Sequence, residues 1–352
     1  MPINTKNRIA FGAYIIILLI ILFISILFAI SLGAADINME DAFGILIKPV
    51  PFIGRIINAN YDESYFSIIW DIRLPRVLLA AVVGMGLAAA GTSFQGLLRN
   101  PMADPYVLGV SSGASFGATL AIVSGLSSGF IGLAGSTVAA FMGAITTMAA
   151  VYTLGNAGKH SSMVTLLLAG IAISSFLSAI VSFIMVFNHD KLESIVLWTM
   201  GSFATASWSS LYLSFPIILI GSIILLTMAR EMNALLMGDE SAMHLGIDVS
   251  RVRKLLLIVG SIITAAAVSA SGIIGFVGLI IPHVVRIFTG PDHRRLLPAA
   301  SISGAIFMII SDTLARTLVA PIEIPVGIIT SLVGGPFFLY LLVRNRKQAY
   351  KG

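Results

Sequence analysis

The sequence predicts an all-α membrane protein, a polytopic bundle of about ten transmembrane helices. Of the 352 residues, 57% are hydrophobic and only 11% are charged, and the mean hydropathy is +1.00. This apolar surface exceeds what one water-soluble core can bury. Apolar runs of about 20 residues recur, each long enough to cross a hydrocarbon core as a helix. Because the runs are continuous rather than alternating, they indicate helices and not barrel strands.

The apolar runs and their interruptions place the candidate spans along the chain. They lie at residues 11–33, 75–96, 107–125, 130–153, 163–187, 209–229, 255–271, 273–288, 298–317 and 325–343. The first run is too long for the apolar part of a signal peptide, so we expect a retained span. The runs 255–271 and 273–288 are kept separate, because merging them would move the basic C-terminal cluster to the opposite side of the membrane.

The distribution of basic residues predicts the orientation. An even number of spans puts both termini on one side, and the positive-inside rule assigns the loops rich in Lys and Arg to the cytoplasm. With both termini cytoplasmic, the 21 Lys and Arg residues lie inside except for Lys48, Arg55, Arg73, Arg76, Lys191 and Arg316. The sequence therefore predicts a multi-pass protein with cytoplasmic termini.

We expect one transmembrane domain over residues 1–352, with three stretches that do not span the membrane. Residues 34–74 form a long outer loop, and residues 188–208 are expected to include a short interfacial helix. Residues 230–254 form the longest inner loop.

The inner loop 230–254 has the pattern of a helical surface that does not span the membrane. It mixes polar and apolar residues at helical spacing, and Gly238 and Gly246 interrupt it. One interpretation is a solvated connector. The alternative is a surface that packs on a partner, favoured by apolar side chains expected to be exposed: Leu235, Leu236, Met237, Met243 and Leu245.

The composition argues against several other functions. Without cysteine the chain has no disulfides, thiol catalysis or cysteine-bound metal. The net charge is +5, but the basic residues lie singly near helix ends rather than in a stripe, so nucleic acid is not an expected partner. The 5 histidines form no pair at helical spacing, so we expect no metal site built from histidine.

Two sequence patterns resemble catalytic or nucleotide-binding motifs but lack the required context. Residues 113–117 read G-x-S-x-G, yet they lie in an apolar helix rather than in a strand-turn-helix. Gly109, Gly113 and Gly117 recur every four residues and are expected to pack helices closely. The stretch around Lys159 fails the P-loop pattern, so any ATP-driven motor must be another polypeptide.

Asp312 and Arg316 form a candidate functional pair near the outer end of a span. They are four residues apart, so they share one helix face and can pair. Ionisable groups at this depth are functional candidates, although pairing for structure alone is the alternative. An ion-driven carrier would need further buried carboxylates at mid-span, and an intramembrane enzyme would need paired catalytic groups at one depth. Asp312 is the only such carboxylate and no paired catalytic groups appear, so the sequence favours neither an ion-driven carrier nor an enzyme.

From Arg73 onward the motifs occur in an order that resembles the FecCD family of permeases, which import ferric siderophores, haem and cobalamin. The resemblance covers nearly the whole chain after the first loop. It is carried by Arg73-Leu-Pro-Arg76, Gln95, Arg99-Asn-Pro-Met-Ala-Asp-Pro105, Leu108-Gly109, Leu166-Leu-Leu-Ala-Gly170, Trp198, Gly201-Ser202, Gly238-Asp-Glu-Ser-Ala242, Leu245-Gly246, Gly275-Phe-Val-Gly-Leu279, Pro282-His283, Arg286, Asp292-His-Arg294, Asp312, Ala315-Arg316, Glu323, Pro325, Gly327 and Gly335-Pro336.

The resemblance implies a type II permease of an ATP-binding cassette (ABC) importer in a prokaryotic cytoplasmic membrane. Two permeases, here expected as a homodimer, would work with two ATPases and an extracytoplasmic binding protein. The permease itself would bind no cofactor, and ATP with magnesium would bind the partner ATPase. A ferric siderophore is the favoured cargo, with haem or cobalamin as the alternative.

The resemblance also implies roles for particular residues. Arg73, Arg76 and Arg316 would receive acidic residues of the binding protein, a role suited to the charged fork of arginine. Asp312 would orient Arg316. The ATPase-coupling segment would comprise Gly238, Asp239, Glu240, Ala242, Leu245 and Gly246, and the cytoplasmic gate would lie around Ser161, Ser162 and Thr165.

Overall fold

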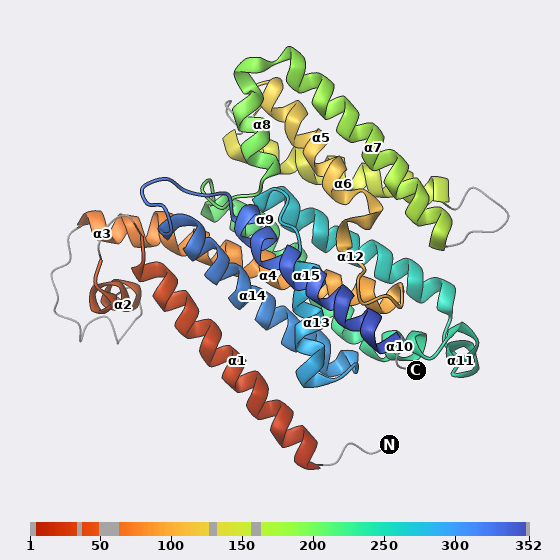
Figure 1. The fold of residues 1–352 in the computed structure, drawn as a ribbon. Coiled ribbons are helices and arrows are strands. Elements are labelled where there is room, and N and C mark those ends of the chain that lie inside the picture. The colour runs from red at the N-terminus through yellow and green to blue at the C-terminus, as the bar shows by residue number, and fades with distance from the viewer. Residues whose placement is uncertain (1–4, 34–36, 49–62, 127–131, 156–162, 350–352) are drawn as a thin grey trace.

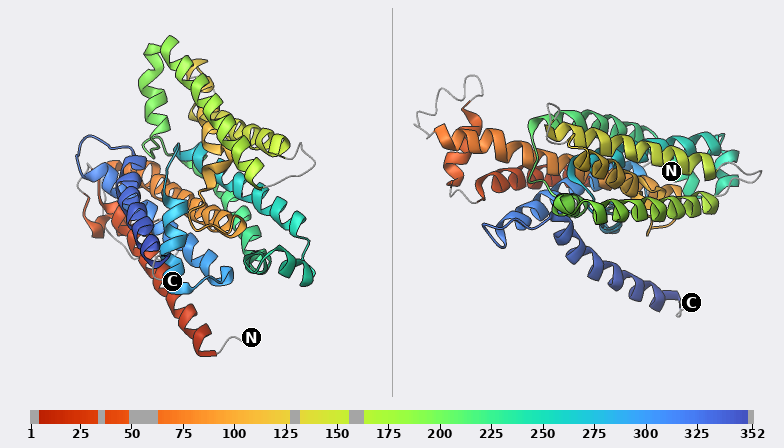
Figure 2. Two further views of the ribbon diagram at one scale, coloured as in Figure 1. Left: turned by 45° about the vertical axis from the view of Figure 1, so that its right-hand side comes forward. Right: turned by 90° about the horizontal axis from the view of Figure 1, so that it is seen from above.

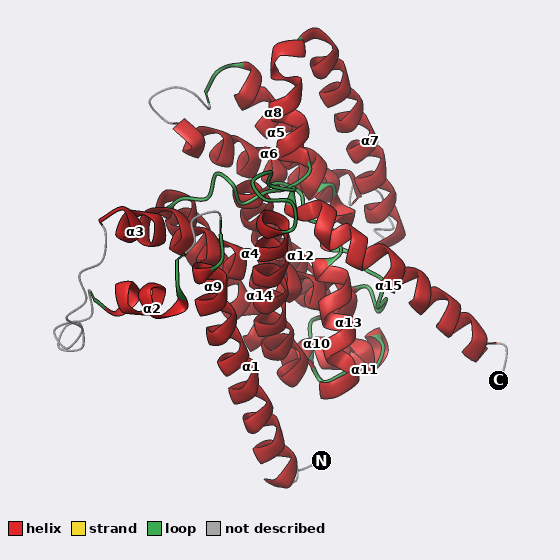
Figure 3. Ribbon diagram, turned by 60° about the vertical axis from the view of Figure 1, so that its left-hand side comes forward, coloured by secondary structure: helices red, strands yellow, loops and turns green. Residues whose placement is uncertain are grey.

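The computed structural model describes residues 5–33, 37–48, 63–126, 132–155 and 163–349, and all regular structure in these ranges is helical (Figure 3). Figure 1 shows the helices packed side by side in a bundle. The helices that match the ten candidate spans are α1 (Thr5–Ser31), α4 (Leu74–Leu97), α5 (Val110–Val123), α6 (Gly132–Gly155), α7 (Met163–Phe187), α9 (Trp208–Thr227), α12 (Val249–Ser271), α13 (Val277–Thr289), α14 (His293–Thr317) and α15 (Val326–Ala349).

The lengths of these helices agree with a membrane bundle. Within the described residues, 7 helices are long and apolar enough to cross a membrane. The remaining three candidate spans correspond to the shorter apolar helices Val110–Val123, Val277–Thr289 and Val326–Leu341. The separation of α12 from α13 is confirmed, because α12 ends at Ser271 and Gly272 follows with a φ of 70°.

Several helices begin at residues other than those predicted. The span expected from residue 255 begins at Val249, so α12 includes part of the predicted inner loop. The Asp248 side chain accepts a hydrogen bond from the Arg251 backbone N–H at 3.0 Å and caps this early start. The span expected from residue 107 begins at Val110, because a 3-10 turn, Pro105–Leu108, precedes it and Gly109 has a φ of 75°.

The described parts of the predicted outer loop 34–74 are also helical. They contain α2 (Met39–Ile47), α3 (Glu63–Ser67) and a π-helical segment, Ile68–Arg73, that continues directly into α4. Residues 188–208 contain the expected short helix, α8 (Leu192–Thr199). The inner loop contains α10 (Ala229–Leu236) and α11 (Asp239–His244).

Helix α4 lies at the centre of the bundle and is buried along nearly its whole length. It packs against α14, α12, α9 and α13. Two of these contacts require glycine, because a Cβ at Gly84 would clash with the carbonyl of Gly304 and a Cβ at Gly91 would clash with the carbonyl of Gly278. Small residues of this kind let helix backbones approach closely in lipid, where packing rather than the hydrophobic effect holds helices together.

Helices α5 to α8 lie together on one side of α4 and α12 (Figure 2). Gly113 and Gly117 of α5 face α6, and a Cβ at either position would clash with the backbone carbonyl of Gly143 or Ala139. Helix α7 packs mainly on α6 and α5, and many of its apolar side chains are exposed on the surface of this single chain.

The two ends of the bundle carry different features. Both termini lie at the end that carries α10 and α11, hereafter the terminal end (Figure 1). Helices α2 and α3 lie at the opposite end, hereafter the arginine end because it contains Arg73, Arg76 and Arg316.

Candidate functional site

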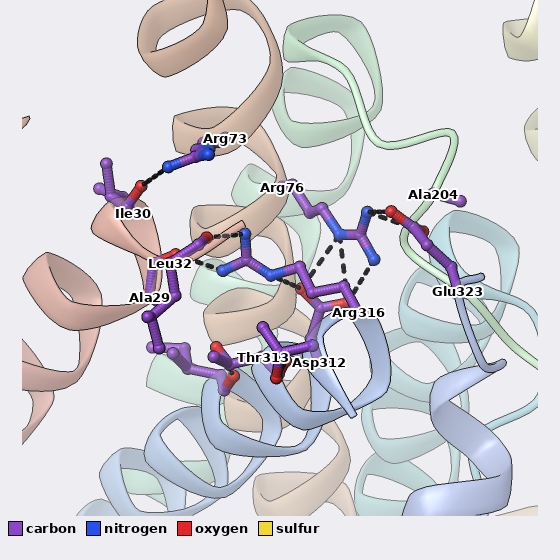
Figure 4. Close-up of polar contacts among 12 residues, drawn as sticks. Ala29, Ile30, Leu32, Arg73, Arg76, Ala204, Asp312, Thr313, Arg316 and Glu323 are labelled. Atoms are coloured by element: carbon purple, nitrogen blue, oxygen red, sulfur yellow. Dashed lines mark hydrogen bonds and ion pairs between the residues drawn. The ribbon is translucent and has the colours of Figure 1, made fainter. Parts of the chain in front are cut away.

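The arginine end is organised by the junction between the π-helical segment and α4. Pro75 is the second residue of α4 and has no backbone N–H to donate. The wider π-helical segment ends at Arg73, directly before α4 begins. Arg73 and Arg76 lie on either side of Pro75. Arg73 points toward α1 and Arg76 points toward α14 (Figure 4).

Asp312 of α14 forms the central ion pair of this end. Its carboxylate accepts hydrogen bonds from Nη2 of Arg76 at 2.9 Å and from Nε of Arg76 at 3.1 Å. Nη1 of Arg76 donates to Glu323 at 2.9 Å. Nε of Arg316 lies 3.7 Å from Asp312, so the predicted pair on α14 is present but longer. The expectation that Asp312 orients Arg316 therefore missed its closer partner, Arg76.

Arg316 and Arg73 hold the C-terminal end of α1. Arg316 donates to the carbonyls of Leu32, at 2.8 Å, and of Ala29. Arg73 donates to the carbonyls of Ile30 and Ser31 at 2.7 Å and 2.8 Å. The last carbonyls of a helix have no partner within the helix and carry partial negative charge, so two guanidinium groups stabilise them. These contacts tie α1 to the central helices.

The three arginines are buried within the chain itself. Arg73, Arg76 and Arg316 expose 5%, 8% and 8% of their surface. Their contacts explain why arginines lie at this end against the overall distribution of basic residues. Direct contact with a binding protein would require these side chains to leave internal partners, and the docking role stays a prediction.

The inner loop has the two predicted breaks, and its exposed surface is partly apolar. Gly238 and Gly246 have φ values of 110° and 79°, which favour glycine, and they bound α11. The exposed apolar side chains are Leu236, Met237, Met243 and Leu245. We name these four residues the coupling surface. The expected exposure of Leu235 is wrong. This residue of α10 is 1% exposed because its side chain packs in the hydrophobic core.

Within the predicted coupling segment, Asp239 is a structural anchor for α11. Its carboxylate accepts hydrogen bonds from Arg253 of α12 at 2.7 Å and 2.8 Å, and it also pairs with Arg99. Arg99 follows α4 and donates from Nε to the carbonyl of Leu235 at 2.7 Å. Its φ of 49° is uncommon for a residue other than glycine. The sequence alone did not predict these contacts. Glu240 is exposed, whereas Ala242 is buried.

A second polar contact ties α10 to the start of α14. The Asn233 side chain donates to Asp292 at 2.6 Å and accepts the His293 backbone N–H at 2.8 Å. Partial burial raises the pKa of Asp292, but hydrogen bonds from Arg294 and Asn233 outweigh it and lower the pKa to about 2. Asp292 is therefore ionised at neutral pH and caps α14 through the Arg294 backbone N–H.

A cavity of about 480 Å³ adjoins the arginine end. Glu323, the second partner of Arg76, lies in its wall together with Lys191 and Trp198. Hydroxyl groups dominate the polar part of the lining and come from Ser136, Thr137, Ser194, Ser202, Thr205, Ser210, Ser269 and Ser271. The sequence analysis did not identify this cavity, because its residues come from distant segments.

The predicted gate residues are only partly within the described chain. Ser161 and Ser162 lie outside the described residues, and Thr165 is exposed in the first turn of α7. The described residues include no group of three or more His, Asp or Glu side chains arranged to hold a metal ion.

We predict that Asp312→Asn lowers the free energy of unfolding by about 3 kcal/mol, because it removes the carboxylate next to the buried Arg316 and leaves the buried Arg76 with Glu323 alone. Thermal unfolding in detergent, followed by circular dichroism, measures the change. Asp190→Asn is the matched control, since Asp190 pairs with Lys191 at an exposed position. Equal unfolding temperatures for both variants would show that the buried pair does not stabilise this end.

Curated relatives match the chain over most of their length. The hemin transport system permease protein of Yersinia pestis is 43% identical over 333 residues, covering 94% of this chain and 95% of the relative. The cobalamin import system permease protein of Halobacterium salinarum is 48% identical over 285 residues, covering 81% of this chain and 75% of the relative.

A solved structure has the same fold. It is described as an inward-facing conformation of a transporter of the metal-chelate ABC type, and it matches with a TM-score of 0.81 and 33% identity. The match covers 95% of this chain and 99% of that one. The model of the FecCD transport family matches residues 18–344. With nearly the whole length matched, the chain belongs to the FecCD transport family.

Proposed function

We propose that this ABC importer permease carries an iron-siderophore-type metal chelate across the cytoplasmic membrane. The coarser activity follows from the family, whose permeases are transport components rather than enzymes. They work with ATPase and binding-protein partners. The observation that supports this cargo is the cavity lined by serine and threonine hydroxyls.

Hydroxyl groups suit a cargo that must bind briefly and leave. Each can donate and accept a hydrogen bond, so together they can meet the oxygen-rich surface of a chelate in several orientations. A transport path works when binding is favourable enough for entry but weak enough for release. Of the two charged side chains in the wall, Glu323 is already paired with Arg76. This leaves mainly neutral contacts for the cargo.

Haem or cobalamin is the second candidate cargo. The relatives described as hemin and cobalamin permeases are 43% and 48% identical to this chain. The cavity also has an apolar part, to which Trp198, Leu197 and Ile122 contribute, and a flat macrocycle could contact it. The proposed siderophore is favoured because hydroxyls from several segments face the same space.

The uptake of different chelates tests the cargo. The permease, with the ATPase and binding protein from the same source, would be reconstituted in vesicles loaded with ATP. We expect ATP-dependent uptake of a radiolabelled ferric siderophore, with haem and cobalamin transported at most one tenth as fast. Vesicles loaded with ADP are the control. Faster uptake of haem or cobalamin would replace the proposed cargo, and uptake that does not need ATP would contradict the ABC mechanism in this reconstitution.

We further propose that two copies of this chain form the permease dimer, with both termini in the cytoplasm. Supporting the dimer, α7 and α15 expose apolar side chains on the surface of one chain, including Phe176 and Leu332. The terminal end would then face the ATPases, which bind ATP and magnesium. The arginine end would face the binding protein, with Arg73, Arg76 and Arg316 as docking residues.

Arg73→Gln tests the docking role. Glutamine keeps an N–H donor but is shorter than arginine and neutral, so the positive charge next to the Ile30 carbonyl is lost. We expect affinity for the binding protein to fall about tenfold at low salt and to depend less on salt, while basal ATPase activity is unchanged. Arg230→Gln, which removes an exposed cation at the terminal end, is the control. Unchanged affinity in a folded Arg73→Gln transporter would contradict the docking role.

Leu245→Asp tests the coupling surface. Leu245 is 64% exposed and lies outside the long apolar helices, so the permease should still insert and fold. A carboxylate in an apolar contact is costly to desolvate, so we expect co-purification of the ATPase and substrate uptake to fall at least tenfold.

Met39→Asp is the control for Leu245→Asp, because Met39 is 52% exposed on α2, at the arginine end. Normal ATPase retention and transport by Leu245→Asp would contradict the coupling role. The loop would then be better described as a solvated connector.

A further inference from the structure

An apolar groove runs along the surface between α6 and α12. It has a volume of about 470 Å³, and two facing rows of side chains form its walls. The α6 row follows one helix face and consists of Phe141, Ile145, Met148, Ala149, Tyr152 and Thr153. The α12 row consists of Lys254, Ile258 and Ile262, spaced one turn apart. Both helices are long and apolar enough to span a membrane, so the groove opens toward lipid.

The length of the groove matches one leaflet of a bilayer. Residues 141 to 153 advance about 18 Å along α6 at 1.5 Å per residue. Half of a hydrocarbon core of about 30 Å is about 15 Å. The groove therefore reaches from near the middle of the membrane to one interface, as a single acyl chain does.

The interfacial end of the groove carries a positive charge. Nζ of Lys254 lies 5.8 Å from the centre of the Tyr152 ring. Among the described residues Lys254 makes no ion pair, and its neighbour one turn earlier, Arg251, is a second exposed cation. Asp248 next to them is already used as the helix cap. A lysine and a tyrosine at the rim of an apolar wall are typical of the level of lipid headgroups.

We propose that this groove binds one phospholipid with an anionic headgroup, with an acyl chain between α6 and α12 and the phosphate at Lys254. Bulk lipid would cover the apolar wall without preference for a headgroup, so the lysine is what makes the site selective. Basic pockets between transmembrane helices are known to bind anionic headgroups in this way. The site lies at the end of α12 that follows α11, so a bound lipid would contact the same helix that Asp239 anchors through Arg253.

Native mass spectrometry of the purified permease tests the proposal. The permease would be released from nanodiscs of phosphatidylcholine containing increasing amounts of phosphatidylglycerol. We expect the wild type to retain one phosphatidylglycerol per chain. Lys254→Gln should weaken this binding about fivefold, which is the contribution of one lysine near an anionic surface. Ile258→Trp should fill the groove and reduce the retention of either lipid.

Two control variants match these changes elsewhere on the surface. Arg230→Gln removes an exposed cation at the same end, and Ile220→Trp adds bulk to the exposed face of α9. Both should retain the lipid as the wild type does. Inorganic phosphate should not displace it, because phosphate alone has no acyl chain for the groove.

Three outcomes would overturn the site. Lys254→Gln and Ile258→Trp could both retain phosphatidylglycerol like the wild type. The wild type could retain phosphatidylcholine equally well, which would leave an unselective apolar surface. The groove variants could instead change the number of permease chains in the complex, which would identify a second copy as the occupant of the groove.

Discussion

The close packing of helices around α4 is the constraint on which the rest of the structure depends. In lipid, apolar surface gains little by moving from the membrane to a helix interface, so helices associate where their backbones can approach closely. At α4 the approach is close enough that Gly84 and Gly91 each face the backbone of a neighbouring helix. The polar residues at the two ends of α4 owe their positions to this central packing.

Each end of α4 then makes polar contacts that fix other helices. At the arginine end, Arg76 reaches Asp312 and Glu323, and Arg73 holds the last turn of α1. Toward the terminal end, Gln95 donates to the carbonyl of Leu279 at 3.0 Å and accepts from Arg286 at 2.7 Å. Charged and polar side chains are costly to bury unless they are paired, and each of these side chains has a partner on another segment.

The sequence was sufficient for the number and order of the ten candidate spans, because a run of apolar residues long enough to cross a membrane is a local property. It was poorer at helix starts. Helices α12 and α14 begin several residues early because Asp248 and Asp292 cap polar turns that have no apolar pattern. The burial of Leu235 was also missed, since the amphipathic pattern of α10 does not reveal which face the other helices cover.

The residues of interest at the arginine end and the terminal end could be identified from the sequence, but their contacts could not. Arg76 and Asp312 are 236 residues apart in the sequence, and only the fold brings them together. The pair within α14, Asp312 with Arg316, was predictable because the two residues are about one helical turn apart in the sequence. Arg99, Asp239 and Arg253 also come from separate segments that only the fold brings together. The sequence does not show how these segments are placed relative to one another. The hydroxyl-lined cavity likewise exists only in three dimensions.

The continuous helical rod from Ser64 to Leu97 has a mechanical consequence. Its 34 residues extend about 51 Å at 1.5 Å per residue, and no loop separates the π-helical segment from α4. A rod of that length behaves as a lever, since a tilt of about 5° about one end displaces the other by about 4 Å. Arg76 lies in the first turn of α4, inside the rod, and the Arg99 contact to Asp239 lies just beyond its C-terminal end. A small rotation imposed on either end would therefore be felt at the opposite face of the membrane as a movement comparable to one side chain.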